Sequence, residues 1–142
     1  MILRMTICKF HGKFQMKKFR AWHPDLQLMW DFTFKDIRNG DLLLPDRNIW
    51  VEIEDLDIME YIGDDYKNIK GRDIQDIQLC EGDIVVPYNR KIWFSAKIIR
   101  NPNNGGWALT ISKSSYFQDI ESWGKLKIIG NIYQNPESLV LD

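Results

Sequence analysis

Apolar and polar side chains alternate with a period of two along several short segments of this chain, a period typical of half-buried β-strands. Residues 17–22 show this alternation, and residues 28–34 repeat it after a short gap. The gap contains Pro24 and Asp25, which favour a turn because proline fixes φ and aspartate bonds to nearby main chain. The pattern predicts a β-hairpin with a loop of about five residues.

The same alternation recurs further along the chain, in residues 48–56, 58–62, 91–99, 107–111 and 125–133. An Asn- and Gly-rich turn at residues 101–106 predicts a second hairpin between two of these segments. No long segment shows helical periodicity, and only Asn135 followed by Pro136 resembles a helix start. We therefore expect a mainly β protein with a short C-terminal helix.

A polar turn at Glu81-Gly82-Asp83 leads into the apolar run of residues 84–86. Glycine has the backbone freedom that a tight strand entry needs, and Asp83 is placed to bond with nearby main chain. We interpret these carboxylates as turn-forming rather than catalytic. Gly130, inside the last predicted strand, indicates a bulge or close packing.

Three segments are predicted along the chain: an N-terminal extension over 1–15, an N-terminal β region over 16–62, and a C-terminal β region over 63–142. Met16 is an internal methionine and an alternative start. Residues 63–78 are polar and form the clearest boundary, which we interpret as a long loop. The alternative is a single integrated domain over 16–142.

The composition is that of a folded protein in an aqueous compartment. Apolar residues make up 44% of the 142 residues and charged residues 27%. No apolar run reaches the roughly 20 residues of a membrane span, and the first residues do not resemble a signal peptide. Cys8 and Cys80 stand far apart without metal-binding spacing. We expect a reduced, cytoplasmic protein that does not bind a membrane.

Charge is unevenly distributed along the chain. Residues 1–24 carry six basic residues and no acid, residues 31–83 carry fifteen acids against six bases, and residues 84–142 carry four acids against seven bases. The simpler interpretation is that these segments neutralise one another within the fold. The alternative is that they pair between subunits, because such fields influence association more than fold.

Catalytic motifs are weak. The acidic segment 52–65 offers carboxylates for Mg²⁺, and Pro45-Asp46 with Asp65-Tyr66-Lys67 resembles the outline of a PD-(D/E)xK nuclease. A solvated strand face explains the same charges more simply.

His11 and His23 lack the partners that a metal site or a general base needs. We therefore expect no enzyme, no metal and no cofactor.

One segment combines an aromatic side chain with several cations. Trp93 lies out of phase with its apolar neighbours Ile92 and Phe94, and basic residues surround it. The candidate contact surface consists of Arg90, Lys91, Trp93, Lys97 and Arg100. Aromatic rings among cations can stack on bases or grip a peptide. A second core face is the alternative interpretation.

An ordered series of motifs resembles the YopX family of bacteriophage and prophage proteins. It runs through residues 16–22, 28–30, 58–63, 81–85 and 128–137. Residues 1–15 lie outside the pattern, and the loop from 63 to 81 is longer than the family's. The resemblance implies a mainly β protein whose C-terminal half is similar to an SH3-like barrel. It implies oligomers but no catalytic residues.

From the residues and the resemblance together we expect a phage accessory protein of the bacterial host cytoplasm that works by binding. The first hypothesis is a protein-interaction or self-assembling module, whose partner is another protein or a second copy. The alternative is a nucleic-acid-binding protein that uses the hairpin around Trp93.

Overall fold

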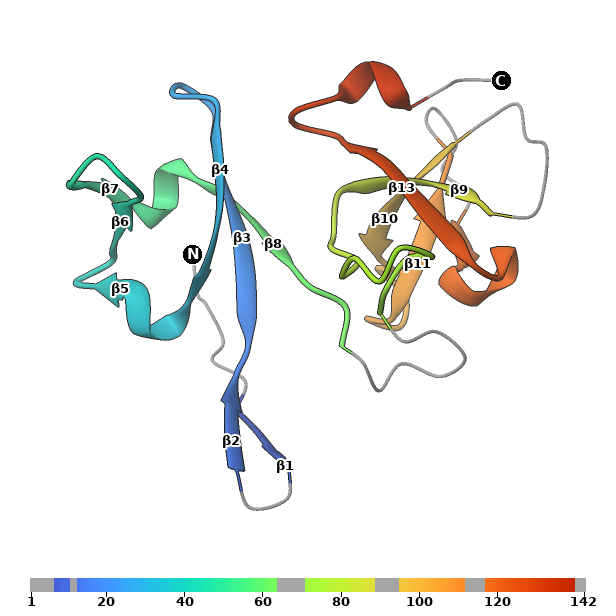
Figure 1. Cartoon of the computed structure of the whole chain (residues 1–142), viewed down its shortest axis with the longest axis horizontal. Coiled ribbons are helices and arrows are strands. Elements are labelled where there is room, and N and C mark those ends of the chain that lie inside the picture. The colour runs from blue at the N-terminus through green and yellow to red at the C-terminus, as the bar shows by residue number, and fades with distance from the viewer. Residues whose placement is uncertain (1–6, 11–12, 64–70, 89–94, 112–116, 140–142) are drawn as a thin grey trace. The chain divides into compact units, whose positions relative to one another are not determined.

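The computed structural model describes residues 7–10, 13–63, 71–88, 95–111 and 117–139 (Figure 1). The chain divides into two compact units, residues 1–60 and residues 61–142. Antiparallel strands dominate both units, and the helical segments are single 3₁₀ turns of three or four residues. The predicted mainly β class is therefore confirmed. None of the helical segments in the described residues has the length and apolarity to cross a bilayer.

The N-terminal unit contains eight strands and two 3₁₀ turns within its described residues. They are β1 (Ile7–Phe10), β2 (Lys13–Met16), β3 (Lys18–His23), β4 (Leu28–Thr33), η1 (Phe34–Asp36), β5 (Ile37–Arg38), β6 (Asp41–Leu44), β7 (Ile49–Glu52), η2 (Ile53–Asp55) and β8 (Asp57–Glu60). They form the ladder β1–β2 and two three-stranded sheets, ordered β4-β3-β8 and β5-β6-β7.

The first predicted hairpin is confirmed as β3–β4. Its register runs from Lys18 opposite Thr33 to His23 opposite Leu28. In the connecting turn the Leu26 N–H donates to His23 Nδ1 at 3.1 Å. The imidazole of His23 thus accepts a hydrogen bond that stabilises the turn.

A tight turn between β5 and β6 shapes the second sheet of this unit. Asn39 and Gly40 both have positive φ, 53° and 80°, as the two central residues of a type I′ hairpin turn require. They join β5 to β6. The strand predicted over 48–56 ends at Glu52, because Ile53 turns into the core within η2.

The core of the N-terminal unit lies between these elements. Its buried members are Phe19, Ala21, Phe32, Leu42, Ile53 and Leu56. The rings of Phe19 and Phe32 stack with centroids 5.6 Å apart. Because β6 contributes Leu42 to the same cluster as β3 and β4, the two sheets share one core.

The C-terminal unit contains one five-stranded antiparallel sheet in the order β12-β11-β10-β9-β13. Its elements are β9 (Asp83–Pro87), β10 (Ala96–Arg100), β11 (Trp107–Thr110), β12 (Phe117–Asp119), η3 (Ile120–Trp123), β13 (Leu126–Asn131) and η4 (Pro136–Ser138). The second predicted hairpin is β10–β11, closed by the turn at 101–106. The register of β13 shifts between Ile128 and Gly130, so the predicted bulge is confirmed.

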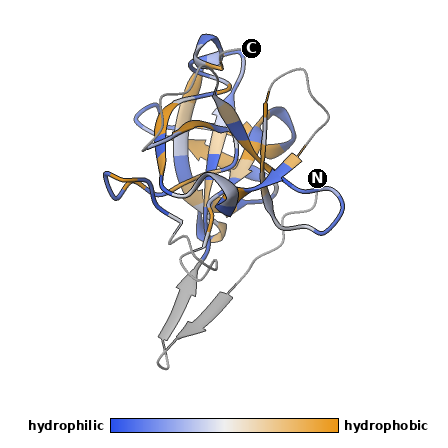
Figure 2. Cartoon of the chain, turned by 90° about the vertical axis from the view of Figure 1, so that its right-hand side faces the viewer, coloured by the Kyte–Doolittle hydropathy of each residue, from blue (hydrophilic) through white to orange (hydrophobic). Residues whose placement is uncertain are grey.

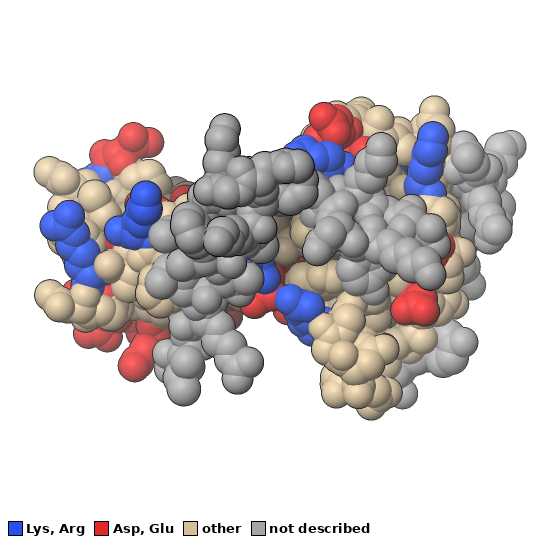
Figure 3. Space-filling model, turned by 90° about the horizontal axis from the view of Figure 1, so that it is seen from below, with Lys and Arg blue, Asp and Glu red and all other residues tan. Residues whose placement is uncertain are grey.

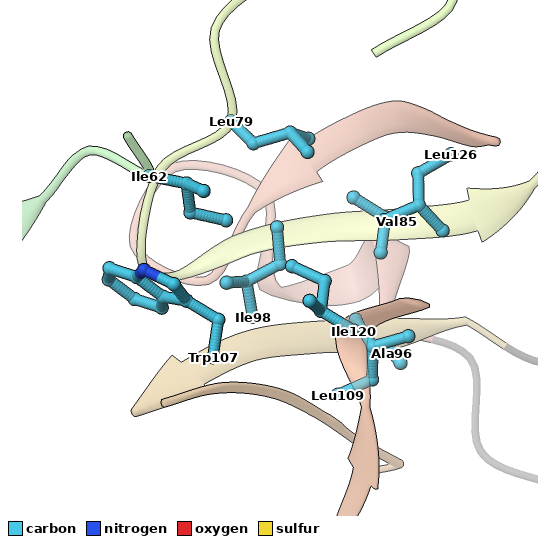
Figure 4. Packing of buried hydrophobic residues seen from close by; sticks show 9 residues of the cluster. All are labelled: Ile62, Leu79, Val85, Ala96, Ile98, Trp107, Leu109, Ile120 and Leu126. Atoms are coloured by element: carbon cyan, nitrogen blue, oxygen red, sulfur yellow. The ribbon is translucent and has the colours of Figure 1, made fainter. Parts of the chain in front are cut away.

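Apolar residues from β9, β10, β11 and β13, together with three from outside the strands, fill the core of this unit (Figure 4). The cluster consists of Ile62, Leu79, Val85, Ala96, Ile98, Trp107, Leu109, Ile120 and Leu126. Figure 2 shows the hydrophobic residues gathered largely on strands and the hydrophilic ones largely on turns and loops. Burial of alternate side chains therefore holds the sheet together.

The predicted SH3-like barrel is not confirmed. In the described part of the chain, β12 and β13 lie at opposite ends of the sheet, and no ladder joins them. The chain leaves β12 directly into η3, whose Ile120 is buried in the core. A helical turn therefore connects the two end strands.

The predicted C-terminal helix is reduced to η4, a single 3₁₀ turn that follows Asn135 and begins with Pro136.

Candidate functional site

The contact surface predicted around Trp93 is only partly within the described residues. Arg90, Lys91 and Trp93 lie outside them, whereas Lys97 and Arg100 are both on β10. Successive side chains alternate between the faces of a strand. Lys97 and Arg100 are three residues apart, so the structure does not bring these two together on one face.

Arg100 braces its own hairpin. Its guanidinium carbon lies 4.0 Å from the ring centroid of Trp107, and its Nη1 donates to the Gly105 carbonyl at 2.8 Å. Trp107 is buried and belongs to the core. Arg100, one of the residues of the predicted contact surface, therefore stabilises the β10–β11 hairpin.

The acidic segment is largely a solvated surface. Glu52, Glu54, Asp55 and Asp57 are exposed, while Glu60 pairs with Lys17 at 3.2 Å. Within the described ranges, no three His, Cys, Asp or Glu side chains gather as they would around a metal ion. Asp64 and Asp65 lie outside those ranges.

An open groove in the N-terminal unit was not predicted. It has a volume of about 480 Å³. Residues from β4, η1, β5, β6 and β7 line it, together with the turn after β6. They are Trp30, Asp31, Phe32, Lys35, Asp36, Arg38, Leu42, Leu43, Pro45 and Trp50. Aromatic and aliphatic side chains thus predominate, with four charged groups among them.

Two large apolar side chains of this groove are exposed as a cross-strand pair. Leu43 of β6 lies opposite Trp50 of β7, and the two are 38% and 45% exposed. Contiguous exposed apolar side chains mark interaction surfaces. Trp50 stands out of phase with Ile49, Val51 and Ile53 in the sequence, and this signal could have identified it.

The main chain of Leu43 faces an open edge. The Ile53 N–H donates to the Gly40 carbonyl at 3.0 Å, which makes Gly40–Ile53 a hydrogen-bonded pair. Such pairs alternate along an antiparallel ladder, so Leu43–Trp50 is a non-hydrogen-bonded pair. The N–H and C=O of Leu43 therefore point away from β7, toward the side of β5. Since β5 pairs with Asp41 and Leu42, no strand of the described chain pairs with Leu43 on that side.

The acids of the groove are engaged, and its cations are not. Asp31 forms ion pairs with Lys18 and Arg20 at 3.7 and 3.9 Å. Asp36 accepts the Thr33 N–H at 2.7 Å. Lys35 and Arg38 are exposed, and among the described residues neither has an ion pair. The groove thus offers two available cations beside an apolar wall.

Charged side chains of both signs are visible on one face of the molecule. In the view of Figure 3, acidic and basic side chains are interspersed, and neither sign forms one continuous field. Trp30 also lines the groove, and its Nε1–H is buried without an acceptor in the described structure. The arrangement suits a ligand that combines apolar groups with hydrogen-bond acceptors.

Comparison with known proteins found one family and one solved structure to report. The family model described as YopX protein matches residues 18–140. The X-ray structure of protein yopX from Bacillus subtilis matches with 15% sequence identity and a TM-score of 0.45, covering 86% of this chain and 95% of that chain. A search of curated proteins found no match.

Proposed function

The chain belongs to the YopX family, and we propose that this member works by binding another protein chain rather than by catalysis. The observation that carries the proposal is the exposed Leu43–Trp50 pair beside the groove. Side chains of this size are rarely left exposed together without an interaction task. Tryptophan is also among the residues that contribute most at protein interfaces.

The proposed setting is that of a bacteriophage or prophage accessory protein in the cytoplasm of a bacterial host. The partner is either a second copy or a different protein. Unpaired strand edges support both options, because an edge presents main-chain groups to another chain. In the N-terminal unit, β7 is such an edge within the described residues.

Affinity capture from a lysate of the bacterial host, combined with light scattering, tests the proposal. The comparison is between the native protein, a Leu43→Ser/Trp50→Ser variant and an Ile77→Ser control. Ile77 is 49% exposed and belongs to the other unit, so the control removes a similar apolar surface elsewhere. We expect the double variant to lose self-association or a captured protein that the control retains.

Two results together would overturn the proposal. One is a native protein that stays monomeric at all concentrations. The other is an identical set of captured proteins for the native chain and the double variant.

The second candidate function is nucleic-acid binding through the hairpin around Trp93. Its support is the cluster of cations and one tryptophan in the sequence. A gel shift with single- and double-stranded DNA and RNA tests it. Phosphate contacts are strongest at low salt, so the absence of a shift at about 50 mM salt would exclude this function.

A further inference from the structure

The groove of the N-terminal unit has features that identify the chemistry of its occupant. We infer that it binds an extended peptide segment of a different protein, with apolar and acidic residues in alternation. The inference rests on the proposed function, because it names the partner of the same site. Main chain, charge and apolar surface each support it separately.

Main-chain geometry favours an extended segment. The N–H and C=O of Leu43 point toward the side where β5 ends, and β5 covers only Asp41 and Leu42. A peptide in strand conformation can hydrogen-bond to the main chain of Leu43. It would then lie beside β6, next to the end of β5. Addition of a strand to an open edge is a common mode of peptide recognition.

Charge favours acidic residues in that segment. Lys35 and Arg38 line the groove without ion pairs among the described residues, whereas Asp31 and Asp36 have partners. A carboxylate of the bound peptide can therefore pair with Lys35 or Arg38. The two acids of the groove are already ion-paired or hydrogen-bonded, so they repel it less. An arginine–carboxylate contact is stronger than a neutral hydrogen bond.

The same charges disfavour a nucleic acid in this groove. Residues 25–60 carry ten acidic residues (Asp25, Asp31, Asp36, Asp41, Asp46, Glu52, Glu54, Asp55, Asp57 and Glu60) and three basic ones (Lys35, Arg38 and Arg47). Binding of a polyanion depends on several phosphate contacts with cations, and the segment that forms the groove has more acids than bases. One or two carboxylates on a peptide need only the local pair of cations.

Apolar residues of the segment have a matching surface. Leu43 and Trp50 project from the same face of the sheet, and Pro45 follows at the end of β6.

The described residues of a second copy are a poor source of such a segment. Residues 51–54, Val-Glu-Ile-Glu, alternate apolar and acidic side chains. Ile53 is buried in the core, however, and Val51 packs against it. A second copy would have to unfold this region to present it, which favours a different protein as the partner.

Fluorescence anisotropy with a labelled synthetic peptide tests the inference. The probe is a blocked peptide of alternating Val and Asp, about eight residues long. The comparison probes are an alternating Val–Lys peptide, the Val–Asp peptide with a central proline, and a thymidine oligonucleotide. We expect the Val–Asp peptide to bind best, and the proline version to bind at least about tenfold more weakly because proline lacks the N–H.

Variants of the groove sharpen the test. Trp50→Ser is expected to weaken binding of the Val–Asp peptide at least about tenfold, while Ile77→Ser leaves it unchanged. Lys35→Glu combined with Arg38→Glu is expected to reverse the preference toward the Val–Lys peptide. Both cations are exposed, so this exchange preserves the core, and circular dichroism confirms the fold.

Several outcomes would overturn the inference. They are equal binding of the two peptides, tighter binding of the oligonucleotide, peptide binding that Trp50→Ser leaves unchanged, and no peptide binding below about 1 mM. Self-association that is lost with Trp50→Ser would identify a second copy as the occupant instead. The proposed function survives each of these if the capture experiment succeeds, so the two failures are distinguishable.

Discussion

The side chains of Asp83 and Asn131 form a buried hydrogen bond between β9 and β13. Asn131 Nδ2 donates to Asp83 Oδ1 at 3.3 Å, and the two residues lie opposite each other in the ladder. The other oxygen, Oδ2, accepts the Cys80 N–H at 2.9 Å. Asp83 thus ties the turn before β9 to the last strand of the sheet.

Asp83→Ala is expected to destabilise the C-terminal unit by about 2–4 kcal/mol, because two buried donors lose their acceptor. Asp83→Asn is expected to lose less stability than Asp83→Ala, since asparagine keeps one acceptor oxygen. Urea unfolding followed by tryptophan fluorescence measures both. Glu137→Ala, at an exposed position of the same unit, serves as the control. Equal stability of Asp83→Ala and this control would contradict the structural task of the carboxylate.

Gly82→Val is expected to impair folding before any binding activity. Gly82 has a φ of 85°, a conformation that a β-branched residue strongly avoids. Its N–H and C=O also bond to Ile98 and Ile132, so the turn cannot easily relax. Asparagine tolerates positive φ better, and Gly82→Asn should therefore retain more stability in the same urea titration. A fully stable Gly82→Val protein that has lost only its binding would show that this turn is functional instead.

Gly71→Ala is expected to cost about 3 kcal/mol, from strain and steric overlap together. Its φ is 63°, and an added Cβ would lie 2.7 Å from the Ile62 carbonyl oxygen. Gly105 provides a matched control, because it has a φ of 72° with open space around its Cβ position. Gly105→Ala should lose only about 1 kcal/mol. Thermal unfolding of the two variants gives the comparison, and equal losses would argue against the close approach at Gly71.

Arg100→Lys is expected to destabilise the β10–β11 hairpin by about 1 kcal/mol. Lysine keeps the charge but loses the planar stacking on Trp107 and the bond to the Gly105 carbonyl. Hydrogen exchange at β11 measures the local loss. If Arg100 acted only through its charge, Arg100→Lys would leave hydrogen exchange at β11 unchanged, and this result would contradict its role in the hairpin.

Much of the architecture was readable from alternation and turn chemistry. The β3–β4 and β10–β11 hairpins, the bulge near Gly130 and the turn at Gly82 all follow from local residue patterns. These features depend on contacts between residues that are close in sequence, so local signals are sufficient. The strand predicted over 48–56 was too long, because Ile53 is drawn into a core that residues far away in the sequence create.

The candidate site was less accessible to prediction. Trp50 is out of phase with its apolar neighbours, a pattern typical of an outward-facing side chain. Trp93 shows the same pattern, but the contact surface predicted around it lies mostly outside the described residues. The groove itself needs β4, η1 and the β5-β6-β7 sheet around one core. No local sequence pattern predicts that β5 is too short to pair with Leu43.

Strand periodicity and turn residues act over short distances, so they were enough to predict a mainly β protein with particular hairpins. The order of the five-stranded sheet and the absence of a β12–β13 ladder in its described part became visible only in the folded chain. The tertiary structure also decided which charges in the groove are engaged and which remain available, since ion pairs such as Arg20 with Asp31 depend on strand register. Register and sheet order arise from packing between distant residues, and a single sequence does not encode that packing in any local pattern.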